Sequence, residues 1–336
     1  MIQVGILGAT GYTALELIKI LLRHPHVNIS TLTSRQEGNP HVSEVHPQLV
    51  DRLDLNIENL SPAQVAERSD CVFSCLPHAA SASLVAEILS TKTRVVDFSA
   101  DYRLADLDTY HQWYGGQHPD PDRLGQVPYG LPELFFDQLA GAQLVANPGC
   151  NPTGPMLALA PLLMDNLIES KRIIVDCKSG VSGAGRTPKL ATHYPECNES
   201  VKPYNVGTHR HTPEFDDILN RATNQEIQVI FTPHLVPMER GILTTTYATP
   251  IGEVSEERLK QTLRDFYREK PFVRVVDHLP ATRDTVGTNY CDIDVRLVGG
   301  VVTLIASIDN LVKGASGAAV QNMNCMYGWP ETTALI

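Results

Sequence analysis

The sequence predicts an α/β protein built from two domains of different texture. Strand and helix signals alternate over residues 1–146, and strand-like segments then outnumber helices in the rest of the chain. The chain has 336 residues, 43% of them hydrophobic and 19% charged, which fits two globular domains at about 150 residues each. Strands separated by helices indicate a parallel, doubly wound sheet, whereas successive strands indicate an α+β domain with a largely antiparallel sheet.

Five short apolar runs in the first part have the composition of buried strands. They are residues 2–7, 27–33, 71–76, 95–98 and 144–146. Apolar residues at helical spacing fill 13–23 and 79–89. The segment 115–132 is rich in proline and glycine and is expected to be a surface loop.

The second part contains six further strand signals and a few helices. The strands are expected at 173–178, 227–234, 242–249, 273–277, 293–298 and 301–308, and the helices at 153–168, 214–223, 255–269 and 312–326. Gly299-Gly300 separates the last two strands and is typical of a two-residue hairpin. The domain boundary is therefore expected near Asn147, with the second domain over residues 147–310.

Composition excludes several classes of function. Lys plus Arg is 27 and Asp plus Glu is 38, so the net charge is 27 − 38 = −11, which argues against binding to nucleic acid. An anionic small molecule remains compatible, because local arginines can outweigh the global charge. No apolar stretch reaches the roughly 18 residues of a membrane span, and the strand-like start at 2–7 carries no secretory signal.

The seven cysteines favour a reducing cytoplasm, and none forms a CxxC pair with zinc-like spacing, so no metal site is expected. Cys71 and Cys75 are interpreted as core residues. Four histidines, at positions 24, 26, 41 and 46, are interpreted as surface loop residues.

The first strand ends in a glycine-rich turn that opens a helix. It reads Gly8-Ala9-Thr10-Gly11-Tyr12-Thr13. Glycines there let the backbone approach a pyrophosphate, and the helix N-terminus supplies N–H groups and a positive dipole. The pattern predicts a Rossmann-type dinucleotide site. An ordinary strand–turn–helix with glycines for tight packing is the alternative.

The end of the second strand selects the cofactor. NAD binders usually place an acidic residue there, for the ribose 2′-hydroxyl. This chain has Ser34 and Arg35 after Thr33, and a hydroxyl with a guanidinium suits a 2′-phosphate. We therefore predict that the cofactor is NADP(H). The alternative is that Arg35 is only a solvated surface residue. Pro77 follows the third strand and is expected to border the cofactor.

Cys150 lies in a different context from the other cysteines. It follows a strand, within the turn Asn147-Pro148-Gly149, and precedes an apolar helix. A helix N-terminus stabilises a thiolate, so this position predicts a nucleophile, with a core cysteine as the alternative. A nucleophilic thiol combined with a nicotinamide cofactor indicates attack on an activated carbonyl followed by hydride transfer.

Such chemistry needs an acid/base, and His209-Arg210-His211-Thr212-Pro213-Glu214 is the richest candidate segment. Thr212 is expected to cap the following helix, with Pro213 and Glu214 in its first turn. An imidazole at a helix N-terminus tends to stay neutral, as a base should at neutral pH. A surface histidine pair or a metal site are the alternatives, although the sequence identifies no further ligands.

These residues resemble those of a known family, the NADPH-dependent N-acetyl-γ-glutamyl-phosphate reductases, and the resemblance covers nearly the whole length of the chain. The markers are residues 8–22, VVDFSADYRL at 95–104, VPYGLPE at 127–133, ANPGCNPTG at 146–154, KSGVSGAGR at 178–186, GTHRHTPE at 207–214, PHLVPMERGI at 233–242 and DNLVKGASGAAVQNMN at 309–324. One position departs from the family pattern, because Asn151 stands where an aromatic residue usually follows the nucleophile.

The resemblance implies that Cys150 attacks the γ-carbonyl of N-acetylglutamyl phosphate, phosphate leaves, and NADPH reduces the thioester to the aldehyde of the arginine pathway. It implies that His211 is the acid/base, tuned by Glu214. By the same match, Arg103, Asn147, His209 and Arg210 are expected to bind substrate, and Ser182, Gly183, Gly185 and Asn310 the cofactor. Arg103, Arg186, Arg210 and Arg240 are all candidates for binding the substrate α-carboxylate.

The resemblance also implies that a C-terminal helix, about 311–336, joins the NADP-binding domain of residues 1–146. The second domain is then catalytic and oligomeric, giving a homodimer or homotetramer. A locally basic cleft of Arg35, Arg103, Lys178, Arg186 and Arg210 is expected. Three alternatives remain. They are an aspartate-semialdehyde dehydrogenase, a lysine-pathway acyl-phosphate reductase with a carrier-bound substrate, and a non-catalytic NADP-sensing regulator.

Overall fold

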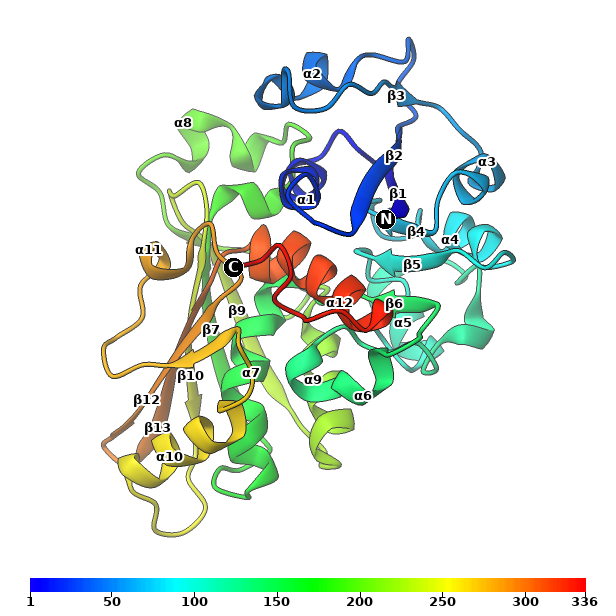
Figure 1. The fold of residues 1–336 in the computed structure, drawn as a ribbon. Coiled ribbons are helices and arrows are strands. Elements are labelled where there is room, and N and C mark those ends of the chain that lie inside the picture. The colour runs from blue at the N-terminus through cyan, green and yellow to red at the C-terminus, as the bar shows by residue number, and fades with distance from the viewer. The chain divides into compact units, whose positions relative to one another are not determined.

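The computed structural model describes all residues, 1–336, and its chain divides into two compact units. Unit 1 comprises Met1–Pro148 and Ala315–Ile336, and unit 2 comprises Gly149–Gly314. Figure 1 shows the elements of both units. None of the helices combines the length and the hydropathy needed to cross a bilayer.

Unit 1 is a six-stranded parallel sheet in the order β3-β2-β1-β4-β5-β6, which confirms the predicted doubly wound arrangement. The strands are β1 Ile2–Leu7, β2 Val27–Thr33, β3 Ile57–Glu58, β4 Cys71–Ser74, β5 Arg94–Asp97 and β6 Leu144–Ala146. The two-residue β3 was not predicted, because so short a strand leaves no periodic signal. The helices are α1 Tyr12–Leu21, α2 Val42–Val45, α3 Pro62–Glu67, α4 Ala82–Ile88, α5 Leu107–Tyr114, α6 Pro132–Leu139 and α12 Gly317–Tyr327.

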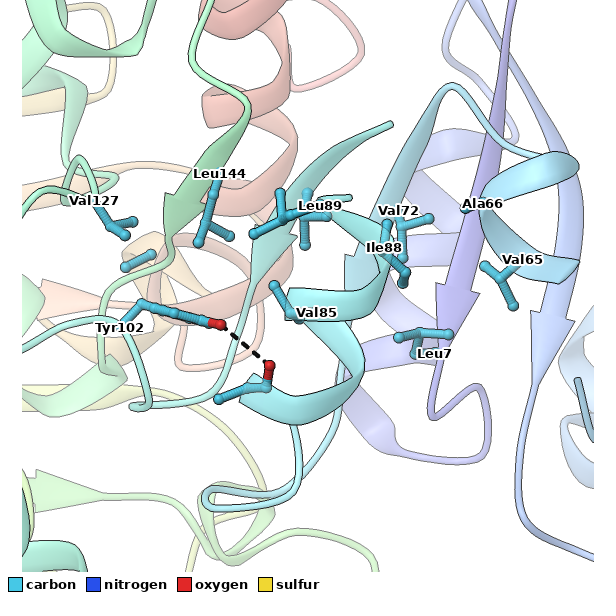
Figure 2. Packing of buried hydrophobic residues seen from close by; sticks show 13 residues of the cluster. Leu7, Val65, Ala66, Val72, Val85, Ile88, Leu89, Tyr102, Val127 and Leu144 are labelled. Atoms are coloured by element: carbon cyan, nitrogen blue, oxygen red, sulfur yellow. Dashed lines mark hydrogen bonds between the residues drawn. The ribbon is translucent and has the colours of Figure 1, made fainter. Parts of the chain in front are cut away.

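The core of unit 1 packs α3 and α4 against the sheet. Val85 and Ile88 of α4 meet Val72 of β4 and Leu7 of β1 in one buried cluster (Figure 2). Tyr102 also belongs to this cluster, and its hydroxyl donates to the Ala82 carbonyl at 3.2 Å. Helices α1 and α12 contact each other, and they contact β2 and β5 respectively.

Two expectations for unit 1 are wrong. The proline- and glycine-rich segment 115–132 is not all surface loop, because Val127, Tyr129 and Leu131 are buried and Val127 belongs to the core cluster. His24 and His46 are buried rather than exposed. Burial lowers the pKa of His24, which hydrogen-bonds Asn324 of α12 at 2.9 Å.

Unit 2 contains a seven-stranded sheet in the order β11-β12-β13-β10-β7-β9-β8. Four neighbouring pairs are antiparallel, whereas β7–β9 and β11–β12 are parallel, so the predicted largely antiparallel sheet is confirmed as a mixed one. The strands are β7 Ile173–Ser179, β8 Lys202–Pro203, β9 Val229–Leu235, β10 Ile242–Ala248, β11 Val273–Val275, β12 Cys291–Val298 and β13 Val301–Ile308. Gly299 and Gly300 both have positive φ, as the predicted hairpin between β12 and β13 requires.

The helices of unit 2 are α7 Cys150–Met164, α8 Tyr194–Cys197, α9 Thr212–Thr223, α10 Glu256–Tyr267 and α11 Thr282–Thr285. Helix α7 is almost wholly buried, and it contacts β7, β10 and β13 as well as α9 and α10. The strand residues that alternate away from α7 are more exposed, as Ile174 and Ile230 show. The expected helix 312–326 is a π-helical turn, Val312–Ser316, followed by α12.

Candidate active site

Unit 1 carries the glycine-rich turn at the carboxyl end of β1. Gly8 has φ +76°, and a Cβ there would lie 2.8 Å from the Cys75 carbonyl oxygen, so only glycine fits. The backbone N–H groups of Gly8 and Ala9 both donate to the Thr33 carbonyl, which fixes the turn beside the end of β2.

Helix α1 begins directly after this turn. Gly11 is its N-cap, no side chain caps it, and its first turn contains no acidic residue. Thr10, Tyr12 and Thr13 surround this helix start. An uncapped helix N-terminus with a positive dipole fits the pyrophosphate of a dinucleotide. The residues of unit 1 therefore fit the predicted cofactor.

The end of β2 also fits the predicted cofactor. Ser34 is partly exposed and Arg35 is exposed, and both lie just past β2 with no acidic residue between Thr33 and Gln36. The Ser34 backbone N–H donates to the Glu58 carbonyl, which holds this segment against β3. Pro77 lies exposed three residues past the end of β4.

His46 supports the glycine-rich turn from a distant part of the chain, a role that the sequence does not predict. Its ring lies against the turn, with Nε2 2.8 Å from the Ala9 carbonyl oxygen. Its neighbours Glu44 and Pro47 gave no signal of this, because the contact spans 37 positions of the chain. A buried imidazole that bonds the turn backbone stabilises the shape of the dinucleotide site.

Arg103 differs from the expectation of an arginine open to an acyl phosphate. Only 4% of the residue is exposed, its Nε donates to the Asn147 carbonyl at 2.8 Å, and its Nη2 donates to the Phe98 carbonyl at 2.7 Å. Asn147 is also buried, and its amide donates to the Ala315 carbonyl and accepts from Asn322. Within unit 1 both residues hold backbone segments together.

Unit 2 presents Cys150 as the first residue of α7. Gly149 is the N-cap with extended backbone, no side chain caps the helix, and its first turn contains no acidic residue. The thiol is partly exposed, whereas the next 13 residues of the helix are buried. Cys150 therefore has the helix-terminal environment that stabilises a thiolate, as predicted from its sequence context.

Glu214 holds the turn that carries this cysteine. Its residue is fully buried, and its Oε1 accepts a hydrogen bond of 2.7 Å from the Gly149 backbone N–H. A carboxylate paired with a backbone N–H next to the nucleophile fixes the start of α7. The sequence did not suggest this contact with Gly149. The tuning of His211 by Glu214 stays a prediction.

The two histidines lie together at the start of α9. Their ring centroids are 4.9 Å apart, and the His211 backbone N–H donates to Nδ1 of His209 at 3.0 Å. Burial, with a smaller effect of Arg210, lowers the pKa of His209 to about 4, so its ring is neutral at neutral pH. His211 itself is the N-cap of α9, so the expected cap by Thr212 is wrong.

The remaining predicted residues of unit 2 form a second group. Asn310 is buried; its Oδ1 accepts from the Gly241 N–H at 2.7 Å and its Nδ2 donates to Ser182 at 2.9 Å. Gly183 and Gly185 follow in the turn after β7 and are exposed. Asn310 thus shapes the Ser182 turn that is expected to meet the cofactor.

The unit 2 arginines and lysine considered in the sequence analysis differ in their surroundings. Cys177 and Lys178 are neighbours in β7, and the Cys177 thiol contacts Asn151 of α7, so Lys178 lies on the opposite sheet face. Its Nζ is instead 3.5 Å from Oγ1 of Thr245. Arg240 pairs with the buried Asp309 at 2.8 Å. Arg186 and Arg210 remain exposed.

The fold and these groups are those of one class of protein, the nicotinamide-dependent oxidoreductases. Residues 3–142 match the family described as semialdehyde dehydrogenase, NAD binding domain, and residues 150–310 match semialdehyde dehydrogenase, dimerisation domain. The chain belongs to the semialdehyde dehydrogenase family.

Relatives of known name narrow the class further. An N-acetyl-gamma-glutamyl-phosphate reductase of Rhodopirellula baltica is 50% identical, with 100% of this chain and 98% of that protein covered. One of Desulforudis audaxviator is 47% identical with the same coverage. Aspartate semialdehyde dehydrogenase II of Vibrio cholerae, complexed with ASA, shares the fold at a TM-score of 0.74 and 17% identity, over 97% of this chain and 98% of that one.

Proposed function

We propose that this chain is an NADP(H)-dependent reductase of N-acetyl-γ-glutamyl phosphate, which forms N-acetylglutamate semialdehyde and phosphate in arginine biosynthesis. The observation that carries the proposal is Cys150 at the uncapped start of α7, in a chain whose named relatives are 46–50% identical over their length. The membership of the family makes it an oxidoreductase.

In the proposed reaction, the Cys150 thiolate attacks the γ-carbonyl carbon and phosphate leaves, giving a thioester. When bound, NADPH supplies the hydride that reduces this carbonyl carbon. His211 accepts the thiol proton before attack and returns a proton to the oxygen of the hemithioacetal. Collapse of that adduct releases the aldehyde and the free thiol.

Exposure separates the arginines available for the anionic substrate. Arg103 is buried against backbone carbonyls and Arg240 pairs with Asp309, whereas Arg186 and Arg210 are exposed in unit 2. We assign Arg210, between the two histidines, to the substrate. Arg210→Gln is expected to raise the KM for the substrate with little change in the KM for NADPH, and Arg186→Gln is the matched comparison.

One assay tests the reaction. Oxidation of N-acetylglutamate semialdehyde with phosphate and NADP is followed as NADPH formation for the wild type and for Cys150→Ser. The serine variant is expected to lose nearly all activity, because a hydroxyl at this position is not ionised. A variant that keeps more than a few per cent of the rate contradicts the thioester mechanism.

The same assay separates the alternatives. If aspartate semialdehyde, or a carrier-bound substrate one carbon longer, is turned over best, the substrate assignment is wrong. If the protein binds NADP but turns over no substrate, it is a non-catalytic regulator. Comparison of NADP with NAD tests the cofactor preference. The pH profile of His211→Asn should lose one limb if His211 is the acid/base.

The exposed face of the unit 2 sheet supports a homo-oligomer. Ile230, Ile174 and Tyr247 lie directly opposite one another on β9, β7 and β10, and their exposed fractions are 52%, 41% and 37%. Such an apolar row is typical of an interface. We propose that a second copy covers it, in a homodimer or homotetramer. Ile174→Asp should lower the mass measured by sedimentation, and an unchanged mass would contradict this.

None of the seven cysteines is part of a disulfide, which supports a reducing compartment. We propose that the protein acts in the cytoplasm, and cell fractionation with antibody detection tests this.

A further inference from the structure

Asn151 is a buried polar residue directly after the nucleophile. It is the second residue of α7 and only 2% of it is exposed. A buried amide needs partners for both its oxygen and its NH2 group. The partners that the structure gives it are two cysteines and a tyrosine of unit 2.

The oxygen of the amide faces sulfur atoms. Asn151 Oδ1 lies 3.8 Å from Sγ of Cys150 and 3.6 Å from Sγ of Cys177, and both thiols are positioned to donate to it. A side-chain hydrogen bond from the Asn151 amide acts to lower the pKa of the Tyr204 phenol, against the larger effect of burial. One side chain therefore links the nucleophile to a buried thiol and to a phenol.

Tyr204 is held in place from its other side. Its ring meets the His209 ring edge-on, with centroids 5.5 Å apart, and the Tyr204 backbone N–H donates to the Pro233 carbonyl at 3.0 Å. Burial raises the pKa of Tyr204, so the phenol keeps its proton. A protonated phenol can either donate or accept, whichever end of the amide faces it.

The nucleophile changes its hydrogen-bonding need when it ionises. A thiol donates and wants an acceptor, whereas a thiolate only accepts and wants a donor. An amide can meet both needs by turning about its terminal torsion, because its O and NH2 ends are nearly the same in shape. Turning directs Nδ2 at Cys150, and the Tyr204 hydroxyl then donates to Oδ1.

We propose that Asn151 and Tyr204 are positioning residues that stabilise the thiolate of Cys150 through this reversal of the Asn151 amide. The proposal rests on the proposed function, since it assigns the Cys150 thiolate the role of nucleophile. An aliphatic side chain at 151 would offer the sulfur no donor. A phenylalanine at 204 would leave the reversed amide oxygen without its donor.

Other ionisable groups of unit 2 lie on the elements around this thiol. They are Cys177 on β7, His209, His211 and Glu214 at the start of α9, and Asp309 and Lys313 on the segment that brings Gly314 against Cys150. Burial keeps Cys177 protonated by raising its pKa. Asn151→Leu and Tyr204→Phe change none of these groups, so a shift in either variant reports the amide or the phenol.

The experiment measures the pKa of the Cys150 thiol. The rate at which iodoacetamide abolishes activity is recorded against pH, and its midpoint gives the thiol pKa regardless of the other cysteines. Asn151→Leu is expected to raise this midpoint by about one unit, equivalent to roughly tenfold less thiolate at neutral pH. Tyr204→Phe is expected to raise it by about half as much.

The double variant gives the sharpest test. Because Tyr204 acts through Asn151, Asn151→Leu combined with Tyr204→Phe should shift the midpoint no further than Asn151→Leu alone. Cys177→Ala is the matched control; it removes the other thiol at Oδ1 and should leave the midpoint where it is. Circular dichroism and the melting temperature check that each variant is folded.

Two results would overturn the inference. If the midpoint stays at the wild-type value in both single variants, the amide has no role in stabilising the thiolate. If the shifts of the two single variants add up in the double variant, Tyr204 does not act through Asn151. Tyr204→Phe keeps the test available if Asn151→Leu does not fold. An active Cys150→Ser enzyme would instead refute the proposed function, so the two failures are distinguishable.

Discussion

Gly314 controls how closely a neighbouring segment approaches the nucleophile. A Cβ placed on it would lie 2.8 Å from Cβ of Cys150, 3.2 Å from its Cα and 3.3 Å from the Asp309 carbonyl oxygen. The first distance is shorter than real Cβ contacts, and it involves the root of a side chain, which cannot rotate away. Gly314→Ala must therefore move either Cys150 or the segment that carries Gly314.

The expected effect follows from that displacement. Restoring an ordinary carbon–carbon contact of about 3.5–4.0 Å requires a movement of roughly 1 Å, and a misplacement of that size costs up to about 100-fold in rate. Overpacking destabilises a core by about 1–3 kcal/mol, against a gain of about 0.5–1 kcal/mol from replacing glycine in a helical segment. We expect kcat/KM to fall 10- to 100-fold and stability to fall by about 1–2 kcal/mol.

Gly154→Ala is the matched control. Gly154 lies in α7, and its added Cβ would meet Ala306, Ile308 and Thr244 at 3.5–3.9 Å, which is ordinary contact. This variant should keep its activity and gain up to about 1 kcal/mol. NADP reduction with N-acetylglutamate semialdehyde and phosphate measures kcat/KM, and urea unfolding measures stability. A Gly314→Ala enzyme with wild-type kcat/KM would refute the steric argument.

Three further predictions concern single residues. Glu214→Ala leaves the Gly149 N–H buried without its acceptor, so it should cost about 1–3 kcal/mol in urea unfolding and lower kcat, while Glu214→Gln, which keeps an acceptor, should stay close to the wild type. Arg35→Ala should raise the KM for NADPH several-fold in steady-state kinetics and leave the KM for NADH unchanged; equal effects would remove the 2′-phosphate role. Burial raises the pKa of Asp97 to about 6, above its unfolded value, so its contribution to stability is complete below about pH 4 and is lost as pH rises through about 6. Asp97→Asn should therefore lose less stability than the wild type between pH 4 and pH 7, by about 2–3 kcal/mol, and equal pH profiles in urea unfolding would contradict this.

Periodic and strongly punctuated segments were predictable from the sequence. The strands at 2–7, 27–33 and 301–308 coincide with the structure, because apolar runs between turn signals dominate them. Short elements such as β3 and α2 were not predictable, since two to four residues carry no period. The start of α7 at Cys150, earlier than expected, follows from glycine and proline signals that also suit a loop.

The candidate site was predictable in its reactive groups and not in its supports. Cys150 and His211 stand out because turn residues and a helix start surround them. His46, Tyr204 and the Glu214 contact with Gly149 depend on pairing across long stretches of chain, which a single sequence does not reveal. Arg103 shows the same limit. An arginine after a strand end suggests a ligand-binding residue, whereas in the structure its buried guanidinium donates to backbone carbonyl oxygens.

The bond from Gly149 to Glu214 has a consequence for how this sequence can change. Glu214 follows His211 by three positions within the first turn of α9, so one helix start sets both the proposed acid/base and the anchor of the nucleophile turn. Inserting one residue between them would turn Glu214 by about 100° around the helix axis and break the anchor. Length variation among descendants of this chain should therefore be tolerated in the exposed loop before His209 and be absent from residues 211–214.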